Sequence, residues 1–178
     1  ELCLYRMEDA TDMMISLDYA GAIKELTYVA QYASDREMKR NALNKKYTCL
    51  FELRRYAQAG ALLDTIRTQY ENANFLARKM QLLVEQKRPL EALNLLEKML
   101  NDSISSENRP FYLNDYEEIA LPYIKEKLSN GATYDAYACC ERLLKYFPAS
   151  YYGLNYALTC ASLLHKTADY DNFAKMAL

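Results

Sequence analysis

The chain has 178 residues, which is enough for one domain of ordinary size with its own hydrophobic core. Half of the residues are hydrophobic (51%), glycine and proline are scarce (4 each), and Leu, Ala and Tyr outnumber Val and Ile. Helix-forming residues therefore dominate, and we expect no extended strands. The net charge of −2 provides no general attraction to nucleic acid or to a membrane surface.

Five predicted pairs of helices follow one another along the chain, each pair joined by a tight turn. Asp18 is a suitable N-cap for the second helix, Pro89 suits the first turn of a helix, and Gly131 suits the turn that ends one. Pro122 lies within a helical pattern and predicts a kink or a late helix start. The predicted pairs are residues 3–17 and 19–33, 35–53 and 56–70, 73–86 and 89–100, 113–128 and 134–147, and 151–165 and 170–178.

Residues 101–110 are polar and end in Pro110, so we predict a loop between the third and fourth pairs. This loop lengthens the spacing between the third and fourth pairs to 44 residues, measured from Ala92 to Ala136. In stacked helical repeats such an insertion lies on one edge of the stack.

One alanine recurs at the same place in four of the second helices. Ala22, Ala59, Ala92 and Ala136 are separated by 37, 33 and 44 residues. Two helices that cross at an axial distance of about 8–10 Å need small side chains where they approach most closely. The alanines therefore predict a solenoid of helical hairpins. The apolar positions that follow them, predicted to be buried, are Leu26, Leu63, Leu96 and Cys140, and then Val29, Ile66, Met99 and Leu143.

This pattern resembles the tetratricopeptide repeat family over nearly the whole chain, residues 3–178. The resemblance rests on Asp18-Tyr19 with Ala22, Arg55-Tyr56 with Ala59, Pro89 with Ala92, and Thr133 with Ala136 followed by Pro148. The repeats are degenerate, and the Trp-Leu-Gly segment usual in the first helix is absent because the chain has no Trp. The resemblance implies an all-α fold, a right-handed α-α superhelix of about four and a half to five hairpins in one domain (residues 1–178).

In this family the first helices line a concave groove that binds partner peptides. Carrying the register over gives candidate groove residues whose amide, hydroxyl and carboxylate groups could bond the backbone of an extended peptide. A solvated helix face is the competing interpretation. The candidates are Asn41, Asn44, Thr48, Glu52, Asn74, Gln81 and Glu85. A clamp for chaperone C-termini is not expected, because Met7 and Thr11 stand where it would need a Lys and an Asn.

A basic segment overlaps the second pair, with only Glu37 and Glu52 opposing seven cations between residues 36 and 55. It could attract an acidic peptide or a phosphate backbone, although a solvated helix face is favoured. Nucleic acid is not expected as a partner, since residues 101–178 hold seven basic and ten acidic residues. The members of the basic patch are Arg36, Lys39, Arg40, Lys45, Lys46, Arg54 and Arg55.

No catalytic, metal-binding or cofactor-binding pattern is present. The single histidine, His165, is the only base available for a nucleophilic dyad, and no glycine-rich phosphate loop exists. Vicinal Cys139 and Cys140 point about 100° apart on a helix, with no other Cys or His close in sequence, so a metal site is not expected. We expect the five cysteines to be reduced core thiols in a cytoplasmic protein.

Residues 146–165 carry no charge and are long enough to span a bilayer, but Pro148 and Gly153 interrupt them, so we expect no membrane insertion. The chain starts without Met and stops inside a helical pattern, so we expect a piece of a longer protein. The predicted function is a non-catalytic scaffold or adaptor that binds a protein or peptide, without a cofactor. The alternatives are an accessory region of a larger enzyme or regulator, such as a glycosyltransferase or a peptide-responsive transcription regulator, and self-association through open solenoid ends.

Overall fold

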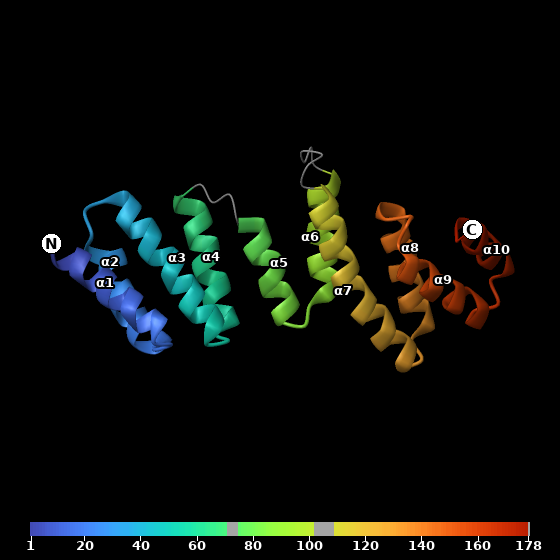
Figure 1. Ribbon diagram of the computed structural model, residues 1–178, viewed down its shortest axis with the longest axis horizontal. Coiled ribbons are helices and arrows are strands. Elements are labelled where there is room, and N and C mark those ends of the chain that lie inside the picture. Colours follow the sequence, from blue (N-terminus) through green and yellow to red (C-terminus); the bar gives the residue numbers. More distant parts are fainter. Residues whose placement is uncertain (71–74, 102–108, 178) are drawn as a thin grey trace. The chain divides into compact units, whose positions relative to one another are not determined.

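The computed structural model describes residues 1–70, 75–101 and 109–177, and every regular element in these ranges is an α-helix (Figure 1). The contacts divide the chain into two compact units, Glu1–Gln86 and Lys87–Leu178. The third predicted pair is divided between them, since its first helix belongs to unit 1 and its second helix to unit 2. The prediction of an all-α fold built from helical hairpins is confirmed for the described residues. The prediction of one domain concerns the whole chain and stays a prediction.

Unit 1 contains two helical hairpins and one further helix. In chain order the helices are α1 (Leu2–Ile15), α2 (Tyr19–Tyr32), α3 (Arg36–Glu52), α4 (Tyr56–Gln69) and α5 (Phe75–Glu85). Each helix packs against the next one along the chain. The first helices of the repeats are therefore α1, α3 and α5, and α2 and α4 are the second helices.

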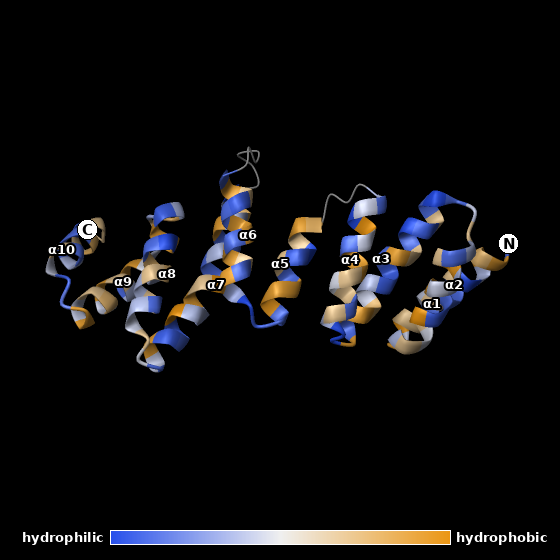
Figure 2. Cartoon of the chain, turned by 180° about the vertical axis from the view of Figure 1, so that it is seen from behind, coloured by the Kyte–Doolittle hydropathy of each residue, from blue (hydrophilic) through white to orange (hydrophobic). Residues whose placement is uncertain are grey.

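Unit 2 contains one helix and two hairpins. Its helices are α6 (Pro89–Asn101), α7 (Arg109–Ser129), α8 (Thr133–Tyr146), α9 (Tyr151–Leu163) and α10 (Thr167–Met176). Here too each helix packs against its successor. Apolar and polar residues are interspersed along the individual helices, as expected for helices that bury one side only (Figure 2).

The four recurring alanines are buried as predicted. Ala22, Ala59, Ala92 and Ala136 are each 0% exposed. The apolar positions four and seven residues later are also buried, which confirms the register along the second helices. The largest exposed fraction among them is 5%, at Met99.

Tight turns join the helices of each hairpin, and one residue in each turn has a left-handed backbone. Leu17, Arg54, Gly131 and His165 have φ values of 64°, 56°, 75° and 55°. In the first turn the backbone N–H of Asp18 donates to the carbonyl of Met13 at 2.8 Å, and the other three turns repeat this bond. This is a Schellman turn, which satisfies carbonyls at the helix end. Of these four residues, only Gly131 was predicted from the sequence to have a positive φ.

Side-chain caps begin several of the helices. The carboxylate of Asp18 accepts from the backbone N–H of Gly21 at 2.8 Å, which confirms the predicted N-cap of α2. Asp35 caps α3 and Ser150 caps α9 in the same way. These caps fix where the helices begin after each turn.

Helix α7 begins earlier than predicted. The prediction placed Arg109 and Pro110 in a loop and began the helix at Leu113, but α7 starts at Arg109. Proline is compatible with the first turn of a helix, because its missing N–H would have no partner there. The rest of the predicted loop, residues 102–108, lies outside the described residues, and Asn101 belongs to α6.

The predicted late helix start at Pro122 is also wrong, because α7 continues through this residue. Pro122 is exposed, as is Glu118 one turn earlier, so water can solvate the carbonyl that loses its hydrogen bond. Helix α10 begins at Thr167 rather than Tyr170, because the turn at His165 leaves Lys166 as its N-cap.

Candidate functional site

Side chains at matching positions of α1, α3 and α5 form what we call the first-helix face of unit 1. Residues spaced by three, four or seven positions on a helix share one side, and α3 and α5 each contribute residues at such spacings, while α1 contributes Thr11. The face consists of Thr11, Asn41, Asn44, Lys45, Thr48, Glu52, Arg78, Gln81 and Glu85.

Two hydrogen bonds link the successive first helices across this face. The ammonium group of Lys45 in α3 donates to the hydroxyl of Thr11 in α1 at 2.6 Å. The guanidinium of Arg78 in α5 donates to the side-chain carbonyl of Asn44 in α3 at 2.5 Å. The three helices are therefore joined by side chains as well as through the intervening second helices.

The ring of Tyr47 packs against the guanidinium of Arg78. This ring is only 4% exposed, and the guanidinium carbon of Arg78 lies 5.0 Å from the ring centroid. The Tyr47 hydroxyl donates to the backbone carbonyl of Arg78 at 3.3 Å. Burial raises the pKa of Tyr47, so its hydroxyl remains a hydrogen-bond donor at neutral pH. The ring therefore positions the Arg78 side chain, and the hydroxyl holds the backbone of α5 at the same residue.

Three predicted groove residues already have partners within unit 1. The amide of Asn44 donates to the carbonyl of Arg40 at 2.9 Å, besides accepting from Arg78. The hydroxyl of Thr48 donates to the carbonyl of Asn44 at 3.3 Å, and Glu85 accepts from the hydroxyl of Tyr56 at 3.0 Å. Two of these hydrogen bonds lie within α3, and the bond between Tyr56 and Glu85 joins α4 to α5.

Three other predicted groove residues are free to meet a partner. Asn41, Glu52 and Gln81 are exposed, and their side chains make no hydrogen bond within the described ranges. Asn74 lies outside the described residues. The groove assignment as a whole stays a prediction.

The seven residues of the predicted basic patch do not gather at one place. They extend from the start of α3 to the turn after it, about 27 Å along the helix direction. Arg36 donates to the carbonyl of Gln69 at 3.0 Å and Arg40 pairs with Glu37, while Arg54 lies in the turn. Lys46 is half-buried, and this burial lowers its pKa. Lys45 bonds to Thr11, as described above. The remaining two members, Lys39 and Arg55, lie near the first end of α3 and at the N-cap of α4.

Sequence analysis missed Arg78, which the structure places beside the predicted groove residues. The spacing of Arg78 from a repeat alanine would have identified it. Lys45 and Arg78 each lie fourteen residues before a repeat alanine, Ala59 and Ala92. Carrying the position of Lys45 forward by one repeat would have identified Arg78.

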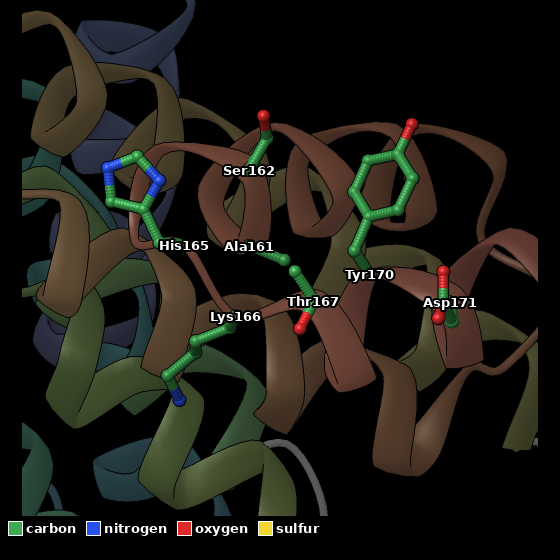
Figure 3. Close-up of a pocket in the computed structure, with 7 residues that line it drawn as sticks. All are labelled: Ala161, Ser162, His165, Lys166, Thr167, Tyr170 and Asp171. Carbon is green, nitrogen blue, oxygen red and sulfur yellow. The ribbon is translucent and has the colours of Figure 1, made fainter.

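Unit 2 has a pocket of about 310 Å³ in the α9–α10 hairpin (Figure 3). Lys166 takes part in other contacts, since its ammonium lies 4.0 Å from the Tyr137 ring centroid and 3.5 Å from the carboxylate of Asp169. The lining residues are Ala161, Ser162, His165, Lys166, Thr167, Tyr170 and Asp171.

This pocket contains a serine, a histidine and an aspartate, but they are not arranged for nucleophilic catalysis. His165 and Asp171 lie at opposite ends of the pocket, with Tyr170 between them in this view (Figure 3). A catalytic triad needs successive hydrogen bonds of about 2.6–3.2 Å from nucleophile to base to acid. None joins Ser162, His165 and Asp171. Within residues 1–70, 75–101 and 109–177, no cluster of three potential metal ligands is present.

Within the described residues the five cysteines form no disulfide, and four of them are buried. Burial raises the pKa of Cys139 to about 11. Interaction with the thiol of Cys160 in α9, together with burial, raises the pKa of Cys140 in α8. Vicinal Cys139 and Cys140 therefore have separate surroundings. No described helix is both long and apolar enough to cross a bilayer.

No protein-family model and no curated protein sequence matches the chain. Solved structures do match. The structure of a MamA RS-1 ArsTM double mutant has a TM-score of 0.56 at 14% identity, covering 99% of this chain and 90% of that one. The chain has the tetratricopeptide-repeat fold.

Two further structures with tetratricopeptide repeats are similar at lower scores. The TPR2AB domain of yeast Sti1, solved as a pHSP90 complex, has a TM-score of 0.47 at 12% identity and covers 98% of this chain and 76% of that one. The C-terminal part of a repeat-containing protein from Cytophaga hutchinsonii has a TM-score of 0.39 at 14% identity, with coverages of 96% and 77%.

Proposed function

We propose that the chain is a non-catalytic protein-interaction module, a scaffold or adaptor that binds an extended segment of a partner protein on the first-helix face of unit 1. The observation that carries this proposal is the pair of bonds from Lys45 to Thr11 and from Arg78 to Asn44. They hold three helices together and leave neighbouring amides exposed. A preorganised surface loses little conformational entropy when a partner binds.

The exposed amides suit the backbone of a bound segment. Asn41 and Gln81 lie on α3 and α5, and each offers a donor and an acceptor. A peptide backbone also presents donors and acceptors in alternation, so amide side chains can bind it with limited dependence on its sequence. A cytoplasmic location accompanies this proposal, because the five thiols are free.

Selection of a random-peptide display library against the full chain tests this function. The peptides selected should bind the unmodified chain and lose roughly tenfold or more in affinity for the double variant Asn41→Ala/Gln81→Ala, which removes two hydrogen-bonding groups. The control is Lys24→Ala/Gln58→Ala, which truncates two exposed residues of α2 and α4.

Circular dichroism and thermal melting would verify that both variants remain folded. The proposal is wrong if no peptide is enriched. It is also wrong if every enriched peptide binds the Asn41→Ala/Gln81→Ala variant as tightly as the unmodified chain.

A further inference from the structure

Two cations on the first-helix face of unit 1 are held by neutral groups. Lys45 is fixed by the hydroxyl of Thr11 at 2.6 Å, and Arg78 by the side-chain carbonyl of Asn44 at 2.5 Å and by the ring of Tyr47. Both side chains are half-buried, and neither forms an ion pair within the described part of unit 1. Their positions are therefore fixed while their charges remain uncompensated.

Other cations on the same two helices are compensated. Arg40 in α3 forms an ion pair with Glu37 at 2.5 Å, and Lys79 in α5 pairs with Asp64 at 3.5 Å. The uncompensated charge of Lys45 and Arg78 is therefore a property of this position and not of α3 and α5 in general.

Both cations keep donors for a ligand. A lysine ammonium has three donors and an arginine guanidinium has five, and the bonds to Thr11 and Asn44 use one from each. A carboxylate is the natural acceptor, since charge-assisted hydrogen bonds are about twice as strong as neutral ones. Partial burial reduces screening by water and salt, which strengthens such a contact further.

The carboxylates of the same face limit where an acidic group can lie. Glu52 and Glu85 follow Lys45 and Arg78 by seven residues, which is about 10 Å along each helix. They would repel an acidic ligand at that end of α3 and α5. The favourable position is the middle of the face, between Lys45 and Arg78.

We propose that the partner segment is acidic, and that Lys45 and Arg78 bind Asp or Glu side chains within it. This inference rests on the proposed function, because it names the chemistry of the partner on the same face. The recognised groups are side-chain carboxylates of an internal segment, not a free chain terminus.

Parallel selections from one random-peptide display library test the inference, one against the full chain and one against Lys45→Gln/Arg78→Gln. Peptides selected by the unmodified chain should be enriched in Asp and Glu relative to the input library. They should lose roughly 10–100-fold in affinity for the variant, corresponding to one or two lost charge-assisted bonds. Peptides selected by the variant should show no acidic enrichment.

The matched control is Arg40→Gln/Lys79→Gln, which removes the same charge from the same two helices. Its affinity for the acidic peptides should stay within a few-fold of the unmodified chain, because those two cations are already paired. The charge-conserving variant Lys45→Arg/Arg78→Lys should retain most of the binding. Circular dichroism would establish that all four forms are folded.

Three results would overturn the inference, and they differ from a failure of the proposed function. Peptides without acidic enrichment that bind Lys45→Gln/Arg78→Gln normally would show that a segment binds but is not acidic. Equal losses with Arg40→Gln/Lys79→Gln would assign the effect to overall charge. Loss of binding when a selected peptide is resynthesised with a C-terminal amide would assign recognition to the chain terminus. A selection that yields no peptide contradicts both proposals together.

Discussion

The guanidinium of Arg78 in α5 donates a 2.5 Å hydrogen bond to the side-chain carbonyl of Asn44 in α3, which joins two first helices of unit 1. Replacing Asn44 with Ala should lower the free energy of unfolding by about 1 kcal/mol, because the guanidinium of Arg78 loses a hydrogen-bond acceptor. The loss stays modest because Arg78 is only half-buried, so water can take the place of the acceptor. Urea denaturation followed by circular dichroism measures this change.

Asn41→Ala is the control for that measurement. Asn41 lies on the same helix, three residues earlier, but is exposed and unbonded, so its replacement should change the unfolding free energy by less than about 0.5 kcal/mol. Equal values for Asn41→Ala and Asn44→Ala would contradict a structural role for the contact with Arg78.

Left-handed residues other than glycine store strain in three of the hairpin turns. Leu17 has a φ of 64° and its side chain is 69% exposed, so glycine would remove the strain with little loss of packing. We expect Leu17→Gly to raise the free energy of unfolding by about 0.5–1 kcal/mol, and Leu17→Ala to give no such gain. Conversely, Gly131→Ala should destabilise by about 1 kcal/mol, since its φ is 75°. Thermal melts would compare the three, and a gain from Leu17→Ala equal to that from Leu17→Gly would exclude backbone strain as the cause.

The repeated fold could be predicted from the sequence because its signals are local. A buried alanine, an N-cap such as Asp18 and a glycine such as Gly131 each report on a few neighbouring residues. The left-handed turn at Leu17 was not predicted, because a leucine carries no preference for positive φ. The early start of α7 was missed because Pro110 is compatible with both a loop and the first turn of a helix.

The candidate site was less predictable, because its contacts join residues far apart in sequence. Asn44 was identified as a groove residue, but its bond to Arg78 depends on how α5 packs beside α3. The basic patch was defined as a continuous segment, whereas in the structure Lys45 bonds to Thr11 of α1 and Arg78 of α5 bonds to Asn44, the neighbour of Lys45 in sequence. Arg36 and Arg54 lie at the start of α3 and in the turn after it. The repeat register shows which residues occupy equivalent positions in successive repeats. Which of their side chains bond to one another depends on how the helices pack in three dimensions.

Two glycines within helices should respond to alanine in opposite directions. At Gly153 in α9 an added Cβ would lie 2.9 Å from Cδ2 of Leu143 and 2.7 Å from Oγ of Ser150, the buried N-cap. Gly153→Ala should therefore destabilise by about 1–3 kcal/mol through overpacking. At Gly60 in α4 the Cβ would meet nothing within 4 Å, so Gly60→Ala should stabilise by about 0.5–1 kcal/mol through helix propensity. Urea denaturation of both variants measures these changes, and a stabilised Gly153→Ala would contradict the close packing of α9 on α8.

The buried thiol of Cys139 should make stability fall at alkaline pH. Burial raises its pKa in the folded chain to about 11, whereas a thiol of the unfolded chain ionises near pH 8.5, roughly its ordinary value. Because the pKa of Cys139 is higher in the folded chain, the contribution of its protonated thiol to the free energy of unfolding is complete below about pH 8.5. This contribution is lost as the pH rises toward 11. The loss should approach about 2–3 kcal/mol at the upper end of this window. Urea titrations from neutral to alkaline pH would measure it beside Cys139→Ala, which lacks the thiol. The stability difference between the two proteins should shrink as the pH rises, and a constant difference would contradict a buried, protonated Cys139.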